Sequence, residues 1–164
     1  MRANGREVAL WSATVGRVVL GGVFVVAGAL KIPDPAEAVR AVRAYRLLPE
    51  VLVAPVAFGM PVVEIAVGLA LLAGVFVRTA AIAAAVMLVV FIAAVASAWA
   101  RGLQIDCGCF GGGGEVAAGE TAYGTEILRD VALLVIALAL ARWPSSHLAL
   151  GRSAHLEEDA TRAR

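Results

Sequence analysis

Charged residues are scarce in this sequence. Asp, Glu, Lys and Arg make up 16% of its 164 residues, against about 25% in a typical soluble domain. Apolar residues make up 61%, and the mean hydropathy is +0.86. A water-soluble globule of this size needs more polar surface than that, so the composition predicts an integral membrane protein. The net charge is only +1, without a basic cluster rich in aromatics, which excludes a nucleic-acid-binding protein.

Cysteine and histidine are also rare, with two of each. A closed zinc site takes four ligands, and His147 and His155 lie in the C-terminal tail, away from Cys107 and Cys109. We therefore expect no metal site. The four glycines at 111–114 are not followed by Gly-Lys-Ser or Gly-Lys-Thr, which excludes a phosphate-binding loop of that type.

Four apolar stretches predict an all-α integral membrane four-helix bundle. The expected spans are residues 8–30, 51–77, 79–100 and 125–143, each near the length of about 20 residues that crosses a bilayer. The fourth is the weakest, because it reaches that length only by including Glu126, Arg129 and Asp130. We expect one membrane domain over residues 1–143 and a polar cytoplasmic tail over 144–164.

The first stretch has a competing interpretation as a cleaved signal peptide. A basic segment precedes it, and Ala-Gly-Ala at 27–29 resembles a cleavage site. However, Arg17 interrupts the apolar run, and 23 residues is long for a signal-peptide core of about 7 to 15 residues. We expect a retained helix, and detection of residues 2–6 in the mature protein by mass spectrometry tests this.

Lysines and arginines outside the spans predict the orientation in the cell membrane. With four spans, the N-terminal segment, the 77–79 turn and the tail share one side of the bilayer. They carry seven Lys and Arg, against five on the opposite side. Because the more basic side faces the cytoplasm, we expect both termini inside the cell and the loops at 31–50 and 102–124 outside it.

The first outward loop contains the pattern of a short interfacial helix. Asp34, Pro35 and Glu37 form an N-cap, a first-turn proline and a capping-box acid. Arginines then recur every third residue from Arg40 to Arg46 and alternate with apolar residues, as in a helix that lies in the membrane interface. We interpret this helix as a solvated cap over the bundle, with a docking surface for a partner as the alternative.

Cys107 and Cys109 flank a single glycine in a glycine-rich loop. Residues two apart can come within the disulfide Cα range of about 4.4 to 6.8 Å, and strained, exposed disulfides are the labile, oxidising kind. A bridge across so short a loop adds little stability. The pair therefore predicts thiol-disulfide exchange. A soft metal such as Cu(I) and two inert thiols are the alternatives.

Several charged residues within or beside the spans form the second set of candidates. Arg17 and Glu64 come at matching depths on consecutive spans, and an unpaired charge at mid-membrane costs on the order of 3 kcal/mol or more. We expect a structural Arg17–Glu64 ion pair, or Glu64 in a proton path or quinone pocket. Asp106 and Asp130 are candidates for proton transfer to the thiols, with Arg129 beside Asp130 at the start of the fourth span.

Four segments of the chain carry a resemblance to a known family. These are residues 17–31 with the pattern RVVLGGVFVVAGALK, Pro-Val-Val-Glu at 61–64 followed by Gly68, Cys-Gly-Cys-Phe-Gly at 107–111, and Arg129-Asp130. The first pattern resembles the first helix of the DoxX-like superfamily of membrane proteins. The others narrow the resemblance to its MauE branch, the methylamine-utilisation membrane proteins.

The resemblance implies a four-helix membrane protein that supports disulfide chemistry of exported proteins beside a thioredoxin-like partner. It makes Cys107 and Cys109 the candidate catalytic residues of a thiol-disulfide oxidoreductase. Two alternatives remain open. One is a non-catalytic membrane anchor or scaffold for the thioredoxin-like partner, and the other is a subunit of a quinone-linked oxidoreductase. A quinone is the one cofactor that any of these alternatives involves.

Overall fold

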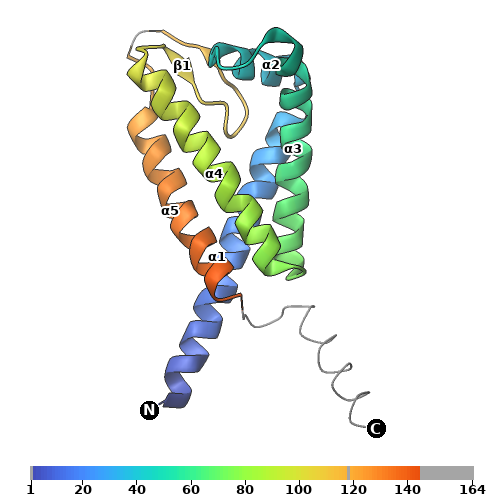
Figure 1. Ribbon diagram of the computed structural model, residues 1–164, viewed down its shortest axis with the longest axis vertical. Coiled ribbons are helices and arrows are strands. Elements are labelled where there is room, and N and C mark those ends of the chain that lie inside the picture. Colours follow the sequence, from blue (N-terminus) through green and yellow to red (C-terminus); the bar gives the residue numbers. More distant parts are fainter. Residues whose placement is uncertain (1, 118, 145–164) are drawn as a thin grey trace.

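The computed structural model describes residues 2–117 and 119–144, and this part of the chain is mostly helical. It contains five helices and one two-stranded antiparallel hairpin (Figure 1). The elements are α1 (Arg2–Lys31), α2 (Pro35–Ala44), α3 (Glu50–Ala73), α4 (Val77–Ala100), β1 (Ile105–Asp106), β2 (Gly114–Glu115) and α5 (Tyr123–Arg142). Most of the predicted tail, with His147 and His155, lies outside the described residues.

Three of the helices are long and apolar enough to cross a membrane: Leu10–Lys31 within α1, α3 and α4. Only 33–39% of the residues in their most apolar windows are buried, so most of each helix surface is apolar and faces outward, as lipid contact requires. Helix α5 packs against α4 and α1, but it is shorter and contains Glu126, Arg129, Asp130 and Arg142. Composition therefore supports three spans, whereas the sequence predicted four.

Helices α1 and α3 are antiparallel and approach each other closely at glycines. A Cβ atom on Gly68 would lie 2.7 Å from the carbonyl oxygen of Gly21, and one on Gly28 would lie 2.8 Å from that of Pro61. Only a residue without a side chain fits so near a neighbouring backbone. These contacts fix the stagger of the two helices, with Gly28 level with Pro61 and Glu64.

Helices α4 and α5 pack through small residues. Ala81 and Ala84 of α4 and Ala137 of α5 are completely buried in one core cluster, as expected of small residues where membrane helices approach. The predicted second span ran to residue 77, but α3 ends at Ala73 because Gly74 adopts a left-handed conformation with φ of 68°. The chain then turns and enters α4.

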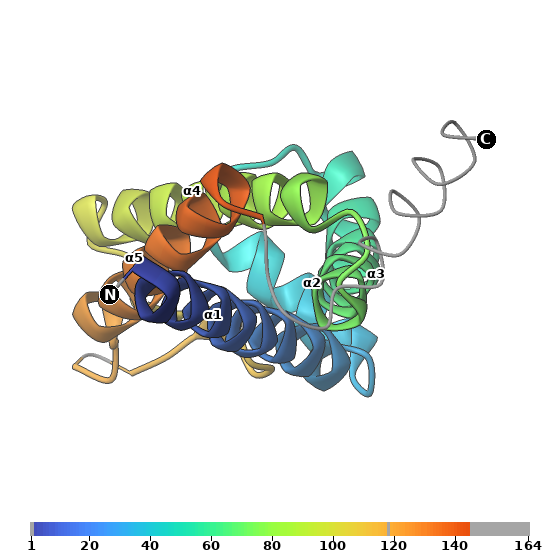
Figure 2. The same cartoon turned by 90° about the horizontal axis from the view of Figure 1, so that it is seen from below.

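Helix α2 and the hairpin lie together at one end of the molecule (Figure 1). Viewed from the opposite end, α2 lies across the long helices rather than parallel to them (Figure 2). The predicted capped helix is confirmed, because Asp34 accepts a hydrogen bond of 2.8 Å from the backbone N–H of Glu37. Arg40 and Arg43 of α2 pair with Asp34 and Glu50. Arg46, just after the helix, lies 2.9 Å from Glu115 of β2. Such internal pairing favours the cap interpretation over a docking surface.

Candidate functional site

The two cysteines lie in the loop between β1 and β2, which packs against α2. Gly108 has φ of 67°, and a Cβ atom there would lie 2.9 Å from Cβ of Ala41. Glycine is therefore required by both its conformation and its neighbour. The hydroxyl of Tyr45 donates a hydrogen bond of 3.1 Å to the carbonyl oxygen of Cys107. The loop thus contacts α2 at Ala41 and the residue after the helix, Tyr45.

Cys107 and Cys109 are free thiols in this structure and interact with each other. The backbone N–H of Cys109 donates to Sγ of Cys107 at 3.3 Å. A hydrogen bond between the two side chains, followed by burial, raises the pKa of the Cys107 thiol. The same bond lowers the pKa of Cys109, because Cys107 stabilises its thiolate. Cys107 is therefore the thiol that keeps its proton and donates it in the hydrogen bond, and Cys109 is the one that more readily becomes the thiolate.

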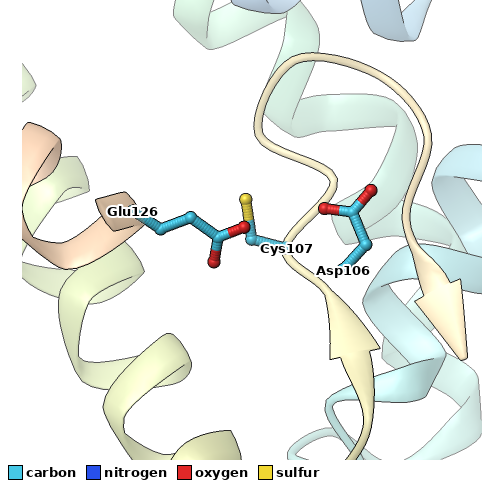
Figure 3. Close-up of side chains that lie close together, drawn as sticks. All are labelled: Asp106, Cys107 and Glu126. Carbon is cyan, nitrogen blue, oxygen red and sulfur yellow. The ribbon is translucent and has the colours of Figure 1, made fainter. Parts of the chain in front are cut away.

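Two carboxylates flank Cys107, and only one of them was a sequence candidate. Figure 3 shows Glu126 extending from α5 toward Cys107, with Asp106 on the other side. The ligand atoms of these three residues lie within 4.8 Å of one another. Asp106 accepts a hydrogen bond of 3.4 Å from the N–H of Gly108. Glu126 is 8% exposed, and its Oε2 has no hydrogen-bond partner among the described residues.

This cluster is the group that comes nearest to a metal site in the described part of the chain. Zinc needs a fourth ligand, and Asp106 and Cys107 already accept hydrogen bonds from loop amides. We therefore interpret Asp106 and Glu126 as acid–base neighbours of the thiol. An acid with a free buried oxygen beside a thiol can take up the thiol proton.

Asp130 lies deeper, one turn along α5 from Glu126, and pairs with its neighbour Arg129. The Nε atom of Arg129 donates to Oδ1 of Asp130 at 2.9 Å, and its guanidinium lies 4.8 Å from the centre of the Phe110 ring. Asp130 is 3% exposed, and its Oδ2 has no hydrogen-bond partner among the described residues. The charged pair at the start of α5 therefore contacts the cysteine loop directly.

A small cavity of about 20 Å³ lies between this pair and Cys109. Cys109, Glu64 and Asp130 all line it. One water needs about 10–15 Å³ of such space and two to four polar partners, so the cavity fits a single water molecule. Cys109 thus shares the small cavity with Glu64 and Asp130, while Cys107 faces Glu126.

The predicted Arg17–Glu64 pair is wrong. Nζ of Lys31 lies 2.6 Å from Oε1 and 2.8 Å from Oε2 of Glu64, which is 1% exposed. Arg17 is also buried, but it lies 14 residues before Lys31 on α1, about 21 Å along a helix. The ends of the apolar runs put Arg17 and Glu64 at matching depths, whereas the helix contacts put Gly28, eleven residues after Arg17, beside Glu64.

Glu126, Lys31 and Tyr45 were not among the candidate site residues. Glu126 had a detectable signal, because it precedes Asp130 by four positions and therefore shares its helix face. Lys31 was counted only as a loop charge, since the apolar run ends at Leu30. Nothing in the sequence connects Tyr45 to a loop 62 residues away.

Comparison with known proteins adds to this geometry. Residues 9–142 match the model of the family described as methylamine utilisation protein MauE. The chain belongs to this family. It is 37% identical over 137 residues to the methylamine utilization protein MauE of Paracoccus denitrificans, which covers 83% of this chain and 70% of that protein. No solved structure matches the chain. Membership of the MauE family is thereby confirmed, and the wider DoxX-like relationship stays a prediction.

Proposed function

We propose that this chain is a membrane thiol-disulfide exchange protein that uses Cys107 and Cys109 to introduce disulfides into exported proteins. The observation that carries the proposal is the pair of cysteines on one glycine-rich loop, joined by the hydrogen bond from the N–H of Cys109 to Sγ of Cys107 and lying beside the buried Glu126. A stability role is disfavoured, since a bridge across so short a loop removes little chain entropy. The family name further suggests that the clients belong to a methylamine-utilisation system.

In the proposed reaction, a client thiolate attacks Sγ of Cys107 in the Cys107–Cys109 disulfide. The disulfide breaks, and Cys109 leaves as the thiolate, because the thiol of lower pKa is the better leaving group. A second client thiolate then attacks the mixed disulfide and releases Cys107. The Cys107 thiolate takes up a proton from Glu126 and the Cys109 thiolate takes up one from Asp130, which replaces the two protons that the client thiols lost. The client loses two electrons and gains a disulfide, and the cysteine pair is reduced to two thiols.

The reaction needs the cysteine loop outside the cytoplasm, in reach of a thioredoxin-like partner, and both three and four spans allow this when the N-terminus is inside. We propose α5 as the fourth span, which puts the C-terminus in the cytoplasm as well. Reporter proteins fused to the N- and C-termini test this topology. A fluorescent reporter that needs the cytoplasm is expected to be active at both ends, whereas three spans would put the C-terminal reporter outside and inactive.

A purified system tests the exchange reaction itself. The oxidised full-length protein in detergent is mixed with a reduced peptide that contains two cysteines, and disulfide formation is followed by mass spectrometry. We expect one peptide disulfide per protein, and none with Cys107→Ser or Cys109→Ser. A Glu120→Gln variant, which changes an exposed acid between β2 and α5, serves as the matched control.

Trapping identifies the cysteine that meets the client. In the Cys109→Ser variant, Cys107 is first activated with an aromatic disulfide reagent and then exposed to a reduced peptide that contains a single cysteine. We expect a stable mixed disulfide on Cys107, since neither the variant nor the peptide has a second thiol to resolve it. If both single-cysteine variants oxidise the peptide as the wild-type protein does, the proposal fails. Co-purification of a thioredoxin-like protein that survives loss of both thiols would then favour the scaffold alternative.

A further inference from the structure

A second, larger cavity also borders the cysteine loop. It has a volume of about 190 Å³, is partly open, and is lined by α2, α3, α4, the loop and Lys31 of α1. Both cysteines contribute to one wall, and apolar side chains such as Met60, Val90 and Phe91 form much of the rest. A cavity of about 150 Å³ lined by apolar side chains binds benzene. A six-membered ring therefore fits in this space.

The cavity extends into the apolar parts of two candidate spans. Met60 lies ten positions from Glu50, the end of α3 beside α2, and Val90 lies ten positions from Ala100, the end of α4 near the loop. Ten residues of helix correspond to about 15 Å. A ligand that reaches this depth must be apolar enough to partition into the bilayer.

The cavity also offers a hydrogen-bond donor to such a ligand. Lys31 lines it, and an ammonium group has three N–H donors. Two of them are directed to the oxygens of Glu64, and the Nζ atom lies 5.9 Å from the centre of the Phe91 ring. One donor is therefore left for an acceptor such as a carbonyl oxygen in the cavity.

The proposed function creates a need for an electron acceptor at this position. Each client disulfide leaves Cys107 and Cys109 as two thiols, and the sequence has no other cysteine to take the electrons. An acceptor in the cavity would contact these two sulfurs directly and take two electrons and two protons. The apolar lining, the depth of the cavity and the donor of Lys31 favour a membrane-soluble molecule with a flat ring and carbonyl oxygens.

We propose that the cavity binds the ring of a membrane quinone, which reoxidises the Cys107–Cys109 pair. The inference rests on the proposed function and names its electron acceptor. The two S–H bonds break and one S–S bond forms, and the electron pair passes to the quinone. Its two carbonyl oxygens each gain a proton, which gives the quinol. Glu126 beside Cys107 and Asp130 in the small cavity beside Cys109 carry the thiol protons.

Quinone reduction by the purified full-length protein tests this proposal. The protein is reduced with excess dithiol, desalted and mixed with decyl-ubiquinone in detergent, with quinol formation followed by ultraviolet absorbance. We expect one quinol per protein and a Cys107–Cys109 disulfide detected by mass spectrometry. Absence of quinol from a protein that oxidises the dithiol peptide overturns the quinone pocket and leaves the proposed function intact.

Two neighbouring alanines of α4 provide a matched pair of variants. Ala94 lines the cavity, whereas Ala93 is exposed on another face of the helix. We expect Ala94→Phe to lower the ratio of the quinone-reduction rate to the peptide-exchange rate at least tenfold and Ala93→Phe to leave it unchanged. Equal ratios in the two variants overturn the proposal.

Photolabelling judges the pocket independently of the cysteine chemistry. An azido derivative of the quinone is irradiated with the Cys107→Ser, Cys109→Ser double variant, which cannot transfer electrons. We expect labelled peptides from α3 or α4 that disappear with excess decyl-ubiquinone. If excess quinone does not decrease the labelling, the cavity binds lipid indiscriminately. This result overturns the proposal even if peptide exchange succeeds. If the wild-type protein does not oxidise the peptide, the proposed function is wrong, and the labelling result alone then tests whether the cavity binds a quinone.

Discussion

The two buried acid–base pairs of this protein differ in how completely they satisfy each other. Lys31 and Glu64 come from different helices, and both carboxylate oxygens of Glu64 accept hydrogen bonds from Lys31. Arg129 and Asp130 are neighbours on α5, and only Oδ1 of Asp130 is bonded in the described part of the chain. The first pair therefore has the properties of a structural clamp. The second leaves a buried oxygen beside the thiols and is suited to proton transfer.

The largest expected effect comes from breaking the clamp. Glu64→Leu leaves the Lys31 ammonium without its partner in an apolar environment, and removing one member of a buried pair costs about 3–5 kcal/mol. Lys31→Met combined with Glu64→Leu is expected to recover most of this loss, because no charge is then stranded. The free energy of unfolding of the four proteins in detergent measures the coupling. A Glu64→Leu protein as stable as the wild type contradicts the clamp.

Changes in the Arg129–Asp130 pair are expected to alter the rate of peptide exchange rather than the free energy of unfolding. Asp130→Asn keeps the Oδ1 contact with Arg129 but removes the ionisable group, and a positioned proton-transfer group typically contributes about 10²–10⁴-fold to a rate. We expect peptide exchange to slow about 100-fold with unfolding changed by less than about 1 kcal/mol. The assay is the purified peptide exchange, followed across a pH series.

The controls for Asp130 separate proton transfer from local packing. Asp130→Glu retains a carboxylate and is expected to restore much of the rate, whereas Glu120→Gln changes only an exposed acid. If Asp130→Asn lowers stability as much as Glu64→Leu and leaves the pH profile unchanged, then both pairs are structural and the contrast between them disappears.

A third change tests what places Lys31 beside Glu64. Gly68→Val puts side-chain atoms against the backbone of Gly21, and overpacking of this kind costs about 1–3 kcal/mol. Gly59→Val on the same helix is the matched control, because a Cβ atom there meets nothing within 4 Å. We expect the melting temperature to fall only for Gly68→Val. Equal melting temperatures would mean that the stagger of α1 and α3 does not depend on this contact.

The same two pairs show what the sequence could and could not predict. The apolar runs predicted the helices, and the Asp34 cap predicted α2, because these signals are local along the chain. The partner of Glu64 depends on the stagger of two helices, which is set by contacts between glycines 47 residues apart. Cys107 and Cys109 were candidates because they lie one residue apart in a glycine-rich loop, which is also a local signal. The sequence puts Glu126 on the helix face of Asp130, but its position beside Cys107 depends on how α5 packs against the loop, which no local pattern encodes.

The smallest predicted effect concerns the division of charge between the thiols. Because the hydrogen bond from Cys107 lowers the pKa of Cys109 and the same bond raises that of Cys107, Cys109 forms its thiolate at lower pH. Only the thiolate reacts with iodoacetamide. Site-resolved mass spectrometry across a pH series is therefore expected to show Cys109 alkylated first as the pH rises.

Removing one thiol at a time sharpens this last expectation. In Cys107→Ala, Cys109 loses the donor that stabilises its thiolate, so its alkylation profile moves to higher pH. In Cys109→Ala, Cys107 is released from the bond that raised its pKa, so its profile moves to lower pH. Parallel shifts in the same direction would show that burial, rather than the bond between the sulfurs, sets both profiles. Cys109 would then no longer be the favoured leaving group, and the client would have no chemical reason to attack Cys107.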